Sequence, residues 1–231
     1  CIFRRKGEQE CTRRQKCRLF LCLSVSYASC IFLLFLHMNI TKVEITRVSS
    51  PSEIIGIRDL QALNLKQYIT SDEAIDQGFV TAAYTIEYLQ EMNAASPAII
   101  AKDGDKVVGY ALVATKDIRN GHDLLNGLFD AIDKCEYNGK LLRDISYVVV
   151  GQLCVAKEYR GQDLAQKIYG HFRDCLSKEF TYLVTDVAQA NTRSLKAHRK
   201  RGFQVINELM YDGFGWDIVL WDWNSSDKKS Y

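Results

Sequence analysis

The stretch that most constrains the fold, residues 147–176, combines an apolar strand, a tight turn and an amphipathic helix. Residues 147–155 are almost continuously apolar, which is typical of a strand covered on both faces. The polar turn A-K-E-Y and the hexapeptide R-G-Q-D-L-A follow, and then apolar residues recur at helical spacing: Leu164, Ile168, Phe172, Cys175 and Leu176. A helix that begins directly after a turn directs unpaired N–H groups and its positive dipole end forward. The pattern therefore predicts an anion site, most often for phosphate.

The hexapeptide from Arg160 to Ala165 resembles motif A of the GCN5-related N-acetyltransferase (GNAT) superfamily, R/Q-x-x-G-x-G/A. In that family the motif holds the pyrophosphate of acetyl-CoA. Arg160 and Ala165 match its ends, and Gly161 is the frequent glycine after the arginine. Asp163 departs from the pattern, because the family usually has a glycine there. Its carboxylate would oppose a pyrophosphate unless the side chain turns outward and caps a helix N–H. Taken alone, the hexapeptide also fits an ordinary strand–turn–helix.

A second motif makes the resemblance more specific. Residues 191–203 read N-T-R-S-L-K-A-H-R-K-R-G-F and resemble motif B of the same superfamily, in which Asn opens a helix and Gly-Phe follows it. The two motifs occur in the family's order, so the chain is identified as a member. The resemblance implies that Asn191 hydrogen-bonds the cofactor arm. Its position alone predicts a helix N-cap, and the two roles are compatible.

The resemblance implies acetyl-CoA as co-substrate, no metal, and direct transfer of the acetyl group to a primary amine of a small molecule or peptide. In the family a backbone N–H on the central strand, where it separates from its neighbour, polarises the thioester carbonyl. The residues implied in cofactor binding are Leu153, Cys154, Val155, Arg160, Gly161, Gln162, Asp163, Leu164, Ala165, Gln166 and Asn191. Cys154 also raises the alternative of a covalent acetyl intermediate, although a cysteine in a buried strand is usually inert.

His198 stands where many family members carry the tyrosine that protonates the departing thiolate. Imidazole can hold or release a proton near neutral pH, so the resemblance implies that His198 is the general acid. The alternative is a solvated histidine among basic neighbours. No general base stands out, and the candidates are Asp144, Glu87, Glu91, Tyr84 or a chain of waters. The aromatic residues Tyr211, Phe214 and Trp216, together with residues 69–84, are candidates for an acceptor pocket or for core packing.

The first 37 residues differ from the rest of the chain. Residues 1–18 carry seven Lys or Arg and two Glu, and residues 19–38 contain no Asp, Glu, Lys or Arg over a length that could cross a bilayer. Three interpretations remain open: an upstream extension outside the functional protein, since the first methionine is Met38; a membrane anchor at residues 19–38; and a secretory signal. The first interpretation predicts a cytoplasmic enzyme. The predicted organisation is therefore an extension at 1–37 and an N-acetyltransferase domain at 38–231.

Charge and cysteines divide at the same place. Residues 1–37 carry a net charge of +5 and the whole chain +2, so residues 38–231 carry −3. A mildly acidic domain without a basic cluster is a poor nucleic-acid binder. Five of the eight cysteines lie in the extension at spacings that match no zinc pattern, and Cys135, Cys154 and Cys175 follow it. Such a scattered set favours a reducing compartment without structural disulfides.

Periodicity and turn signals predict the remaining elements. Strands are expected at 41–48, 98–102, 106–115, 147–155, 182–187, 203–210 and 216–223, with helices at 52–68, 85–95, 122–134, 164–176 and 192–200. This order matches the acetyltransferase order with one extra helix. It predicts an α/β fold with a mixed sheet of about seven strands and helices on both faces.

Two further function classes remain open. A non-catalytic acyl-CoA-binding module would explain Asp163 and the lack of an evident base. A membrane-tethered interaction domain would explain the apolar run at residues 19–38. Acetyl transfer to an added amine separates the first class from an enzyme.

Overall fold

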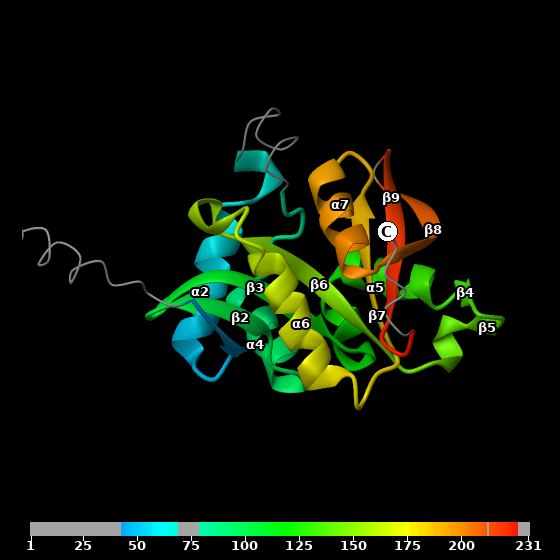
Figure 1. Cartoon of the computed structure of the whole chain (residues 1–231), viewed down its shortest axis with the longest axis horizontal. Coiled ribbons are helices and arrows are strands. Elements are labelled where there is room, and N and C mark those ends of the chain that lie inside the picture. The colour runs from blue at the N-terminus through cyan, green and yellow to red at the C-terminus, as the bar shows by residue number, and fades with distance from the viewer. Residues whose placement is uncertain (1–42, 69–78, 212, 226–231) are drawn as a thin grey trace, which may run out of the picture. The chain divides into compact units, whose positions relative to one another are not determined.

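Seven strands of the chain pair into a mixed sheet (Figure 1). The computed structural model describes residues 43–68, 79–211 and 213–225. In spatial order the strands are β1 (Glu44–Arg47), β2 (Ile99–Asp103), β3 (Lys106–Ala114), β6 (Tyr147–Val155), β7 (Tyr182–Ala188), β9 (Phe214–Asp222) and β8 (Gln204–Tyr211). A separate hairpin pairs β4 (Glu136–Tyr137) with β5 (Lys140–Leu141). Only the pairing of β6 with β7 is parallel among the described strands.

Helices cover both faces of this sheet. They are α2 (Pro51–Ala62), α4 (Ile86–Ala95), α5 (Asp123–Ile132), α6 (Leu164–Leu176) and α7 (Thr192–Arg201). Helices α6 and α7 lie in front of the sheet in Figure 1, and α4 and α5 lie behind it. The arrangement confirms the predicted α/β fold, because each sheet face and each amphipathic helix buries its apolar side against the other.

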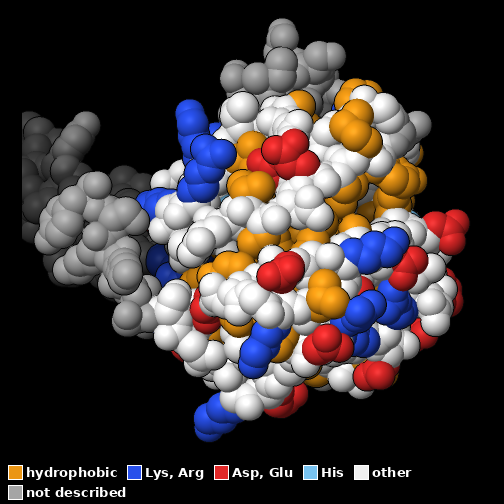
Figure 2. All heavy atoms as spheres, turned by 90° about the vertical axis from the view of Figure 1, so that its right-hand side faces the viewer, with side chains coloured by type: hydrophobic (Ala, Val, Ile, Leu, Met, Phe, Trp, Pro, Cys, Tyr) orange, Lys and Arg blue, Asp and Glu red, His pale blue; other side chains and the backbone are white. Residues whose placement is uncertain are grey.

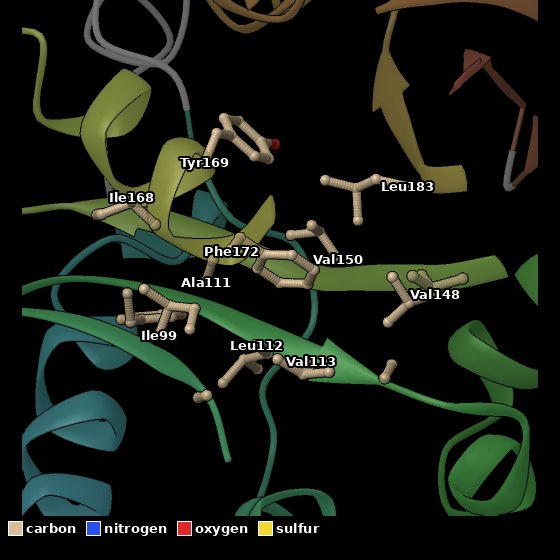
Figure 3. Close-up of a cluster of buried hydrophobic side chains, with 14 of the residues drawn as sticks. Ile99, Ala111, Leu112, Val113, Val148, Val150, Ile168, Tyr169, Phe172 and Leu183 are labelled. Carbon is tan, nitrogen blue, oxygen red and sulfur yellow. The ribbon is translucent and has the colours of Figure 1, made fainter. Parts of the chain in front are cut away.

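Strand β6 forms the centre of the core, as its apolar sequence predicts. Val148 and Val149 are fully buried. On one face, Ile168 and Phe172 of α6 point onto β3 and β6 (Figure 3). Tyr169 leaves the same helix in another direction, toward β7 (Figure 3). Helix α6 therefore packs the core with Ile168 and Phe172, while Tyr169 extends from the helix in a different direction.

The predicted helix at residues 52–68 is shorter than expected. Helix α2 ends at Ala62, and a short 3₁₀ turn occupies Lys66–Tyr68. The amide of Asn64 donates to the carbonyl of Leu60 at 2.8 Å, which satisfies one of the acceptors that a helix end leaves open. Leu63, the first residue after α2, is 75% exposed. The predicted helix was too long because Leu65, which is buried but not helical, continues the apolar spacing of the sequence past the end of α2.

The hairpins follow their turn residues. The predicted Asp-Gly turn joins β2 to β3, and Gly104 there has φ +58°, a left-handed conformation that glycine adopts without strain. The closing hairpin of β8 and β9 also forms where predicted. The β4–β5 hairpin was not predicted, because two-residue strands carry too little periodicity to be recognised.

The first 37 residues lie outside the described part of the chain, as does the apolar run at residues 19–38. The extension, the anchor, the signal and the domain boundary at residue 38 therefore stay predictions. Among the helices of residues 43–68, 79–211 and 213–225, none is both long and apolar enough to cross a membrane.

Candidate functional site

Strands β6 and β7 pair over only three positions and then separate. Tyr147, Val148 and Val149 pair with residues 182–184, and no pairing is found beyond Val149. The hydroxyl of Thr185 donates to the carbonyl of Val150 at 2.9 Å, at the point where the strands part. Beyond this point no described strand pairs with the last residues of β6 on the β7 side.

The N–H directions along β6 follow from its pairing with β3. The N–H of Ala156 donates to the carbonyl of Val108 at 2.8 Å, and successive residues of a strand direct their backbone groups to opposite neighbours. The N–H of Cys154 therefore points at β3. The N–H groups of Leu153 and Val155 point to the opposite side, where β7 has separated from β6.

Two cavities meet at this separation. The α6 cavity, about 320 Å³, lies at the start of α6, and the α5 cavity, about 340 Å³, lies between α5, β7 and β9. Seven residues line both: Phe79, Val80, Leu153, Tyr169, Asn191, Ser194 and His198. A molecule in one cavity can therefore reach a molecule in the other along this shared wall.

The α6 cavity carries positive charge. Its described lining includes the basic residues Arg160, Arg193, Lys196 and Lys200 and a single acid, Asp163. The first N–H groups of α6 open toward it, and the cap residue Asp163 makes no side-chain hydrogen bond to them. Backbone donors, the helix dipole and the surrounding cations all favour an anion here.

The turn before α6 contains two left-handed residues. Gly161 has φ +81° and Asp163 has φ +56°. Aspartate is one of the few non-glycine residues that tolerate this conformation, which explains how it replaces a glycine. Its carboxylate turns to Lys200 Nζ at 2.8 Å, and this ion pair holds the pKa of Asp163 below its usual value. The negative charge is thus directed at a lysine rather than capping a helix N–H.

The α5 cavity has the opposite character. Most of its wall is apolar, and its described charged residues are Asp123 and Asp186, with no lysine or arginine among them. Hydrophobic side chains also gather in a hollow on the face that carries β8 and β9 (Figure 2), where Met210 and Tyr211 are exposed. Cavity and rim therefore suit an apolar molecule with a positive group.

Asp186 is a partly buried acid in the wall of this cavity. It lies on β7, beyond the point where β6 separates, and burial raises the pKa of Asp186 to about 6. Among the described residues, the carboxylate receives a hydrogen bond only from its own backbone N–H. Tyr84 lines the same cavity, and its pKa is raised by burial and by the charge of Asp186. The carboxylate is thus poised to exchange a proton near neutral pH.

Tyr169 and His198 form the polar part of the shared wall. The Tyr169 hydroxyl lies 2.7 Å from His198 Nε2, and His198 Nδ1 lies 2.8 Å from the carbonyl of Ser194. A carbonyl only accepts, so Nδ1 carries the ring proton and Nε2 accepts from the tyrosine. Burial lowers the pKa of His198 to about 4, which keeps the ring neutral at pH 7.

Comparison with known proteins identifies the family. The sequence model of the Acetyltransferase (GNAT) family matches residues 65–203, more than half of the chain. The chain belongs to the GNAT family of acetyltransferases. A search of curated protein sequences finds no significant match to this chain.

Solved structures show that this GNAT chain shares its fold with distant relatives. A GNAT-family acetyltransferase from Streptococcus agalactiae is 17% identical with a TM-score of 0.55, and the match covers 78% of this chain and 95% of that one. A putative acetyltransferase from Salmonella typhimurium with its cofactor acetyl-CoA is 12% identical (TM-score 0.53; 80% and 96% covered). The ribosomal-protein-S18-alanine N-acetyltransferase from Escherichia coli is 11% identical (TM-score 0.52; 82% and 99% covered).

Ten of the eleven residues predicted for the cofactor line the α6 cavity of the GNAT chain. They are Leu153, Cys154, Val155, Arg160, Gly161, Asp163, Leu164, Ala165, Gln166 and Asn191. Gln162 is exposed, does not line the cavity, and donates to the carbonyl of Glu158 at 3.1 Å. The guanidinium of Arg160 binds the carbonyl of Val155 and the side chain of Asn64, which fixes the turn against the end of β6.

Helix α7 is placed by Asn191 and Gly202. The side chain of Asn191 accepts from the N–H of Ser194 at 3.1 Å, so the N-cap predicted from its position is present. Asn191 is also buried and lines both cavities. Gly202 ends the helix with φ +102°, as its place in the motif predicts. The amide of Gln166 donates to the carbonyl of Ala197 at 2.9 Å and links α6 to α7.

The structure separates the alternatives for the remaining predicted residues. His198 is 5% exposed, so it is not a solvated histidine. Burial raises the pKa of Cys154 to about 12, and its thiol stays protonated rather than nucleophilic. Among the candidate bases, Asp144, Glu87 and Glu91 are exposed and line neither cavity, whereas Tyr84 lines the α5 cavity.

Asp186 was missed at the sequence level. Its signal was a lone carboxylate inside the apolar strand Y-L-V-T-D-V-A, which conflicts with burial on both faces.

The predicted aromatic wall is present in part. Tyr211 and Trp216 line the α5 cavity, whereas the Phe214 ring lies under Lys66 Nζ, 4.4 Å from its centroid. Residues 69–78 of the predicted acceptor segment lie outside the described part.

Proposed function

We propose that this chain is an N-acetyltransferase that moves the acetyl group of acetyl-CoA directly to a primary amine. One observation carries the proposal: a positively charged cavity and an acidic apolar cavity meet where β6 and β7 separate. The first suits the phosphates of a coenzyme and the second an amine. The shared wall brings the two reacting groups together, which is the main requirement of a two-substrate transfer.

The α6 cavity is the proposed cofactor site. The open N–H groups at the start of α6, with Arg193, Lys196 and Lys200 on α7, would hold the pyrophosphate. The putative acetyltransferase from Salmonella typhimurium, which has a similar fold and was solved with its cofactor acetyl-CoA, supports this assignment. Asn191 lies at the shared wall and would contact the arm that leads to the thioester.

Leu153 is the proposed donor to the thioester carbonyl. Its N–H points away from β3, and it is the residue of the three candidates that lines both cavities. An N–H fixed in a strand needs no reorganisation when negative charge develops on the carbonyl oxygen. Val155 has the same N–H direction but lines only the α6 cavity.

Tyr169 is the proposed proton donor to the departing thiolate. The neutral ring of His198 offers only an acceptor, Nε2, toward the cavities, because Nδ1–H is bound to Ser194. His198, the expected general acid, would therefore act through the hydroxyl of Tyr169 as a positioning residue. The phenol keeps its proton at neutral pH, since burial raises the pKa of Tyr169 well above its usual value.

The two reasons for a non-catalytic binding module lose their force. The carboxylate of Asp163 is paired with Lys200 rather than opposing an anion. A group able to accept a proton, Asp186, lines the cavity where none had been recognised. No observation on the described residues favours an interaction domain over an enzyme.

The test is acetyl transfer by the purified full chain. Acetyl-CoA is mixed with a panel of primary amines and one peptide with a free N-terminus, and the released CoA thiol is measured with a thiol reagent. Acetyl-CoA alone should raise the melting temperature, because a ligand of the folded state stabilises it. A thermal shift without thiol release on any acceptor would favour the binding module, and absence of both would refute the proposal.

A further inference from the structure

We infer that the acceptor is a compact primary amine on an apolar body, held in the α5 cavity with its amino group at Asp186. The inference rests on the proposed acetyl transfer and names the class of its second substrate. Membership of the GNAT family does not by itself specify that class.

The cavity wall sets the body of the acceptor. Side chains from four elements line it: Leu125 and Leu128 from α5, Val187 from β7, Leu209 from β8 and Trp216 from β9. Its volume of about 340 Å³ lies near the lower end of ligand-binding clefts, roughly 300–1,000 Å³. Burial of an apolar group in such a space is favourable by roughly 25 cal/mol per Å². A small aryl or alkyl group fits these conditions.

The charges set the polar end. A carboxylate in an apolar cavity is costly unless a cation or donor accompanies it, and Asp186 receives no side-chain hydrogen bond among the described residues. An ammonium group supplies both charge and donors. The titratable residues that line the same cavity are Tyr84, Asp123, Tyr169, His198 and Tyr211, and none of these carries a positive charge at neutral pH. The cavity therefore selects against acceptors that carry their own carboxylate.

The place of Asp186 also balances the protons of the reaction. The carboxylate takes one proton from the ammonium group and frees the lone pair of the nitrogen. That lone pair forms the C–N bond, and the C–S bond breaks with its electrons on sulfur. The Tyr169 hydroxyl turns from His198 Nε2 to the sulfur, gives it its proton, and recovers one from the nitrogen of the addition intermediate. Asp186 finally releases its proton to water, which its pKa of about 6 permits at neutral pH.

Matched amines test the inference on the full chain. 2-Phenylethylamine, ethylamine and phenylalanine share the amino group, and they differ in the apolar body or in an added carboxylate. We expect kcat/KM for 2-phenylethylamine to exceed the other two values by at least tenfold. A tripeptide and spermidine extend the panel to peptide and polycationic acceptors. Transfer to these instead of 2-phenylethylamine would overturn the inference and leave the proposed function standing; no transfer at all would refute the proposed function itself.

Variants test the role of Asp186. Asp186→Asn keeps the shape and removes the proton acceptor, so kcat/KM for 2-phenylethylamine should fall on the order of a hundredfold. The acetyl-CoA thermal shift should persist. Asp144→Asn is the matched control, because Asp144 is exposed and lines neither cavity. Equal activity of Asp186→Asn and the wild type would remove Asp186 from the site, and Asp186→Glu tests whether a displaced carboxylate restores part of the loss.

Discussion

The hydroxyl of Tyr169 and Nε2 of His198 lie 2.7 Å apart, on different helices and 29 residues apart in sequence. Both side chains are buried and both line the two cavities. Because His198 Nε2 accepts this bond and Nδ1–H is bound to Ser194, the pair presents the tyrosine oxygen to the two cavities rather than an imidazole N–H.

The proposed roles of these two residues, Tyr169 as proton donor and His198 as positioning residue, give the first prediction. Tyr169→Phe removes the hydroxyl, so turnover should fall on the order of a hundredfold with little change in acetyl-CoA affinity. His198→Gln retains a hydrogen-bond acceptor near Nε2 and should lose tenfold or less. Steady-state kinetics with saturating acetyl-CoA measure both. A larger loss in His198→Gln than in Tyr169→Phe would make the imidazole itself the acid.

The second prediction concerns Asp163. Asp163→Gly relieves a non-glycine residue at φ +56°, removes a carboxylate from the basic cavity and releases Lys200, so CoA should bind severalfold more tightly. Asp163→Asn keeps the backbone preference and removes only the charge. Calorimetric titration with CoA separates these contributions. Weaker binding by both variants would show that the Asp163–Lys200 pair shapes the site.

The third prediction uses two glycines in the same backbone state. Gly161 and Gly104 both have positive φ, and an added Cβ meets no atom within 4 Å at either position. Gly161→Glu and Gly104→Glu should therefore destabilise the fold similarly, by roughly 1–2 kcal/mol. Only Gly161→Glu places a carboxylate at the α6 cavity, so it alone should abolish the acetyl-CoA thermal shift. Retention of the shift would remove this turn from the cofactor site.

Asp186 and His198, whose pKa values are shifted in opposite directions, give the fourth prediction. The pKa of Asp186 is raised from 3.8 to about 6, so the folded chain holds more protons there and the free energy of unfolding falls as pH rises from about 4 to 6. The pKa of His198 is lowered from 6.5 to about 4, so its contribution to that free energy rises with pH over a similar window. In the wild type the two contributions to the pH dependence of the unfolding free energy therefore oppose each other.

Each single variant should expose one slope. Relative to the wild type, Asp186→Asn should gain stability as pH rises from 4 to 6, and His198→Gln should lose it, each by up to about 1.4 kcal/mol per pH unit. Urea unfolding at pH 4.5, 5.5 and 6.5 measures both differences. Variant profiles that run parallel to the wild type would mean that neither group is displaced in the folded state.

Local signals predicted the structural elements around the α6 cavity well. The β6–turn–α6 unit and the Asn191 cap depend on residues close in sequence, where strand, turn and helix preferences agree. Gly202 likewise ends α7 because a left-handed residue is required at that position. These features need no knowledge of the rest of the fold.

The α5 cavity depends on contacts between residues far apart in the sequence, which no local pattern contains. Gln61 Nε2 donates to Gln152 Oε1 at 2.9 Å across 91 residues, and Gln152 Nε2 donates to the carbonyl of Ala82 at 2.8 Å. This buried network holds the chain before Tyr84 over the cavity. The place of Asp186 in the cavity wall could not be predicted either, because it depends on the point at which β7 separates from β6.

The three residue pairs between β6 and β7 also make the centre of the sheet its narrowest seam. Strands on either side are joined by longer ladders, seven pairs between β7 and β9 and six between β3 and β6. In the proposed complex, coenzyme and acceptor would lie in the space where β6 and β7 are unpaired and would contact both halves of the sheet. We therefore expect the two halves of the sheet to be held together more firmly when both substrates are bound than when this gap is unfilled.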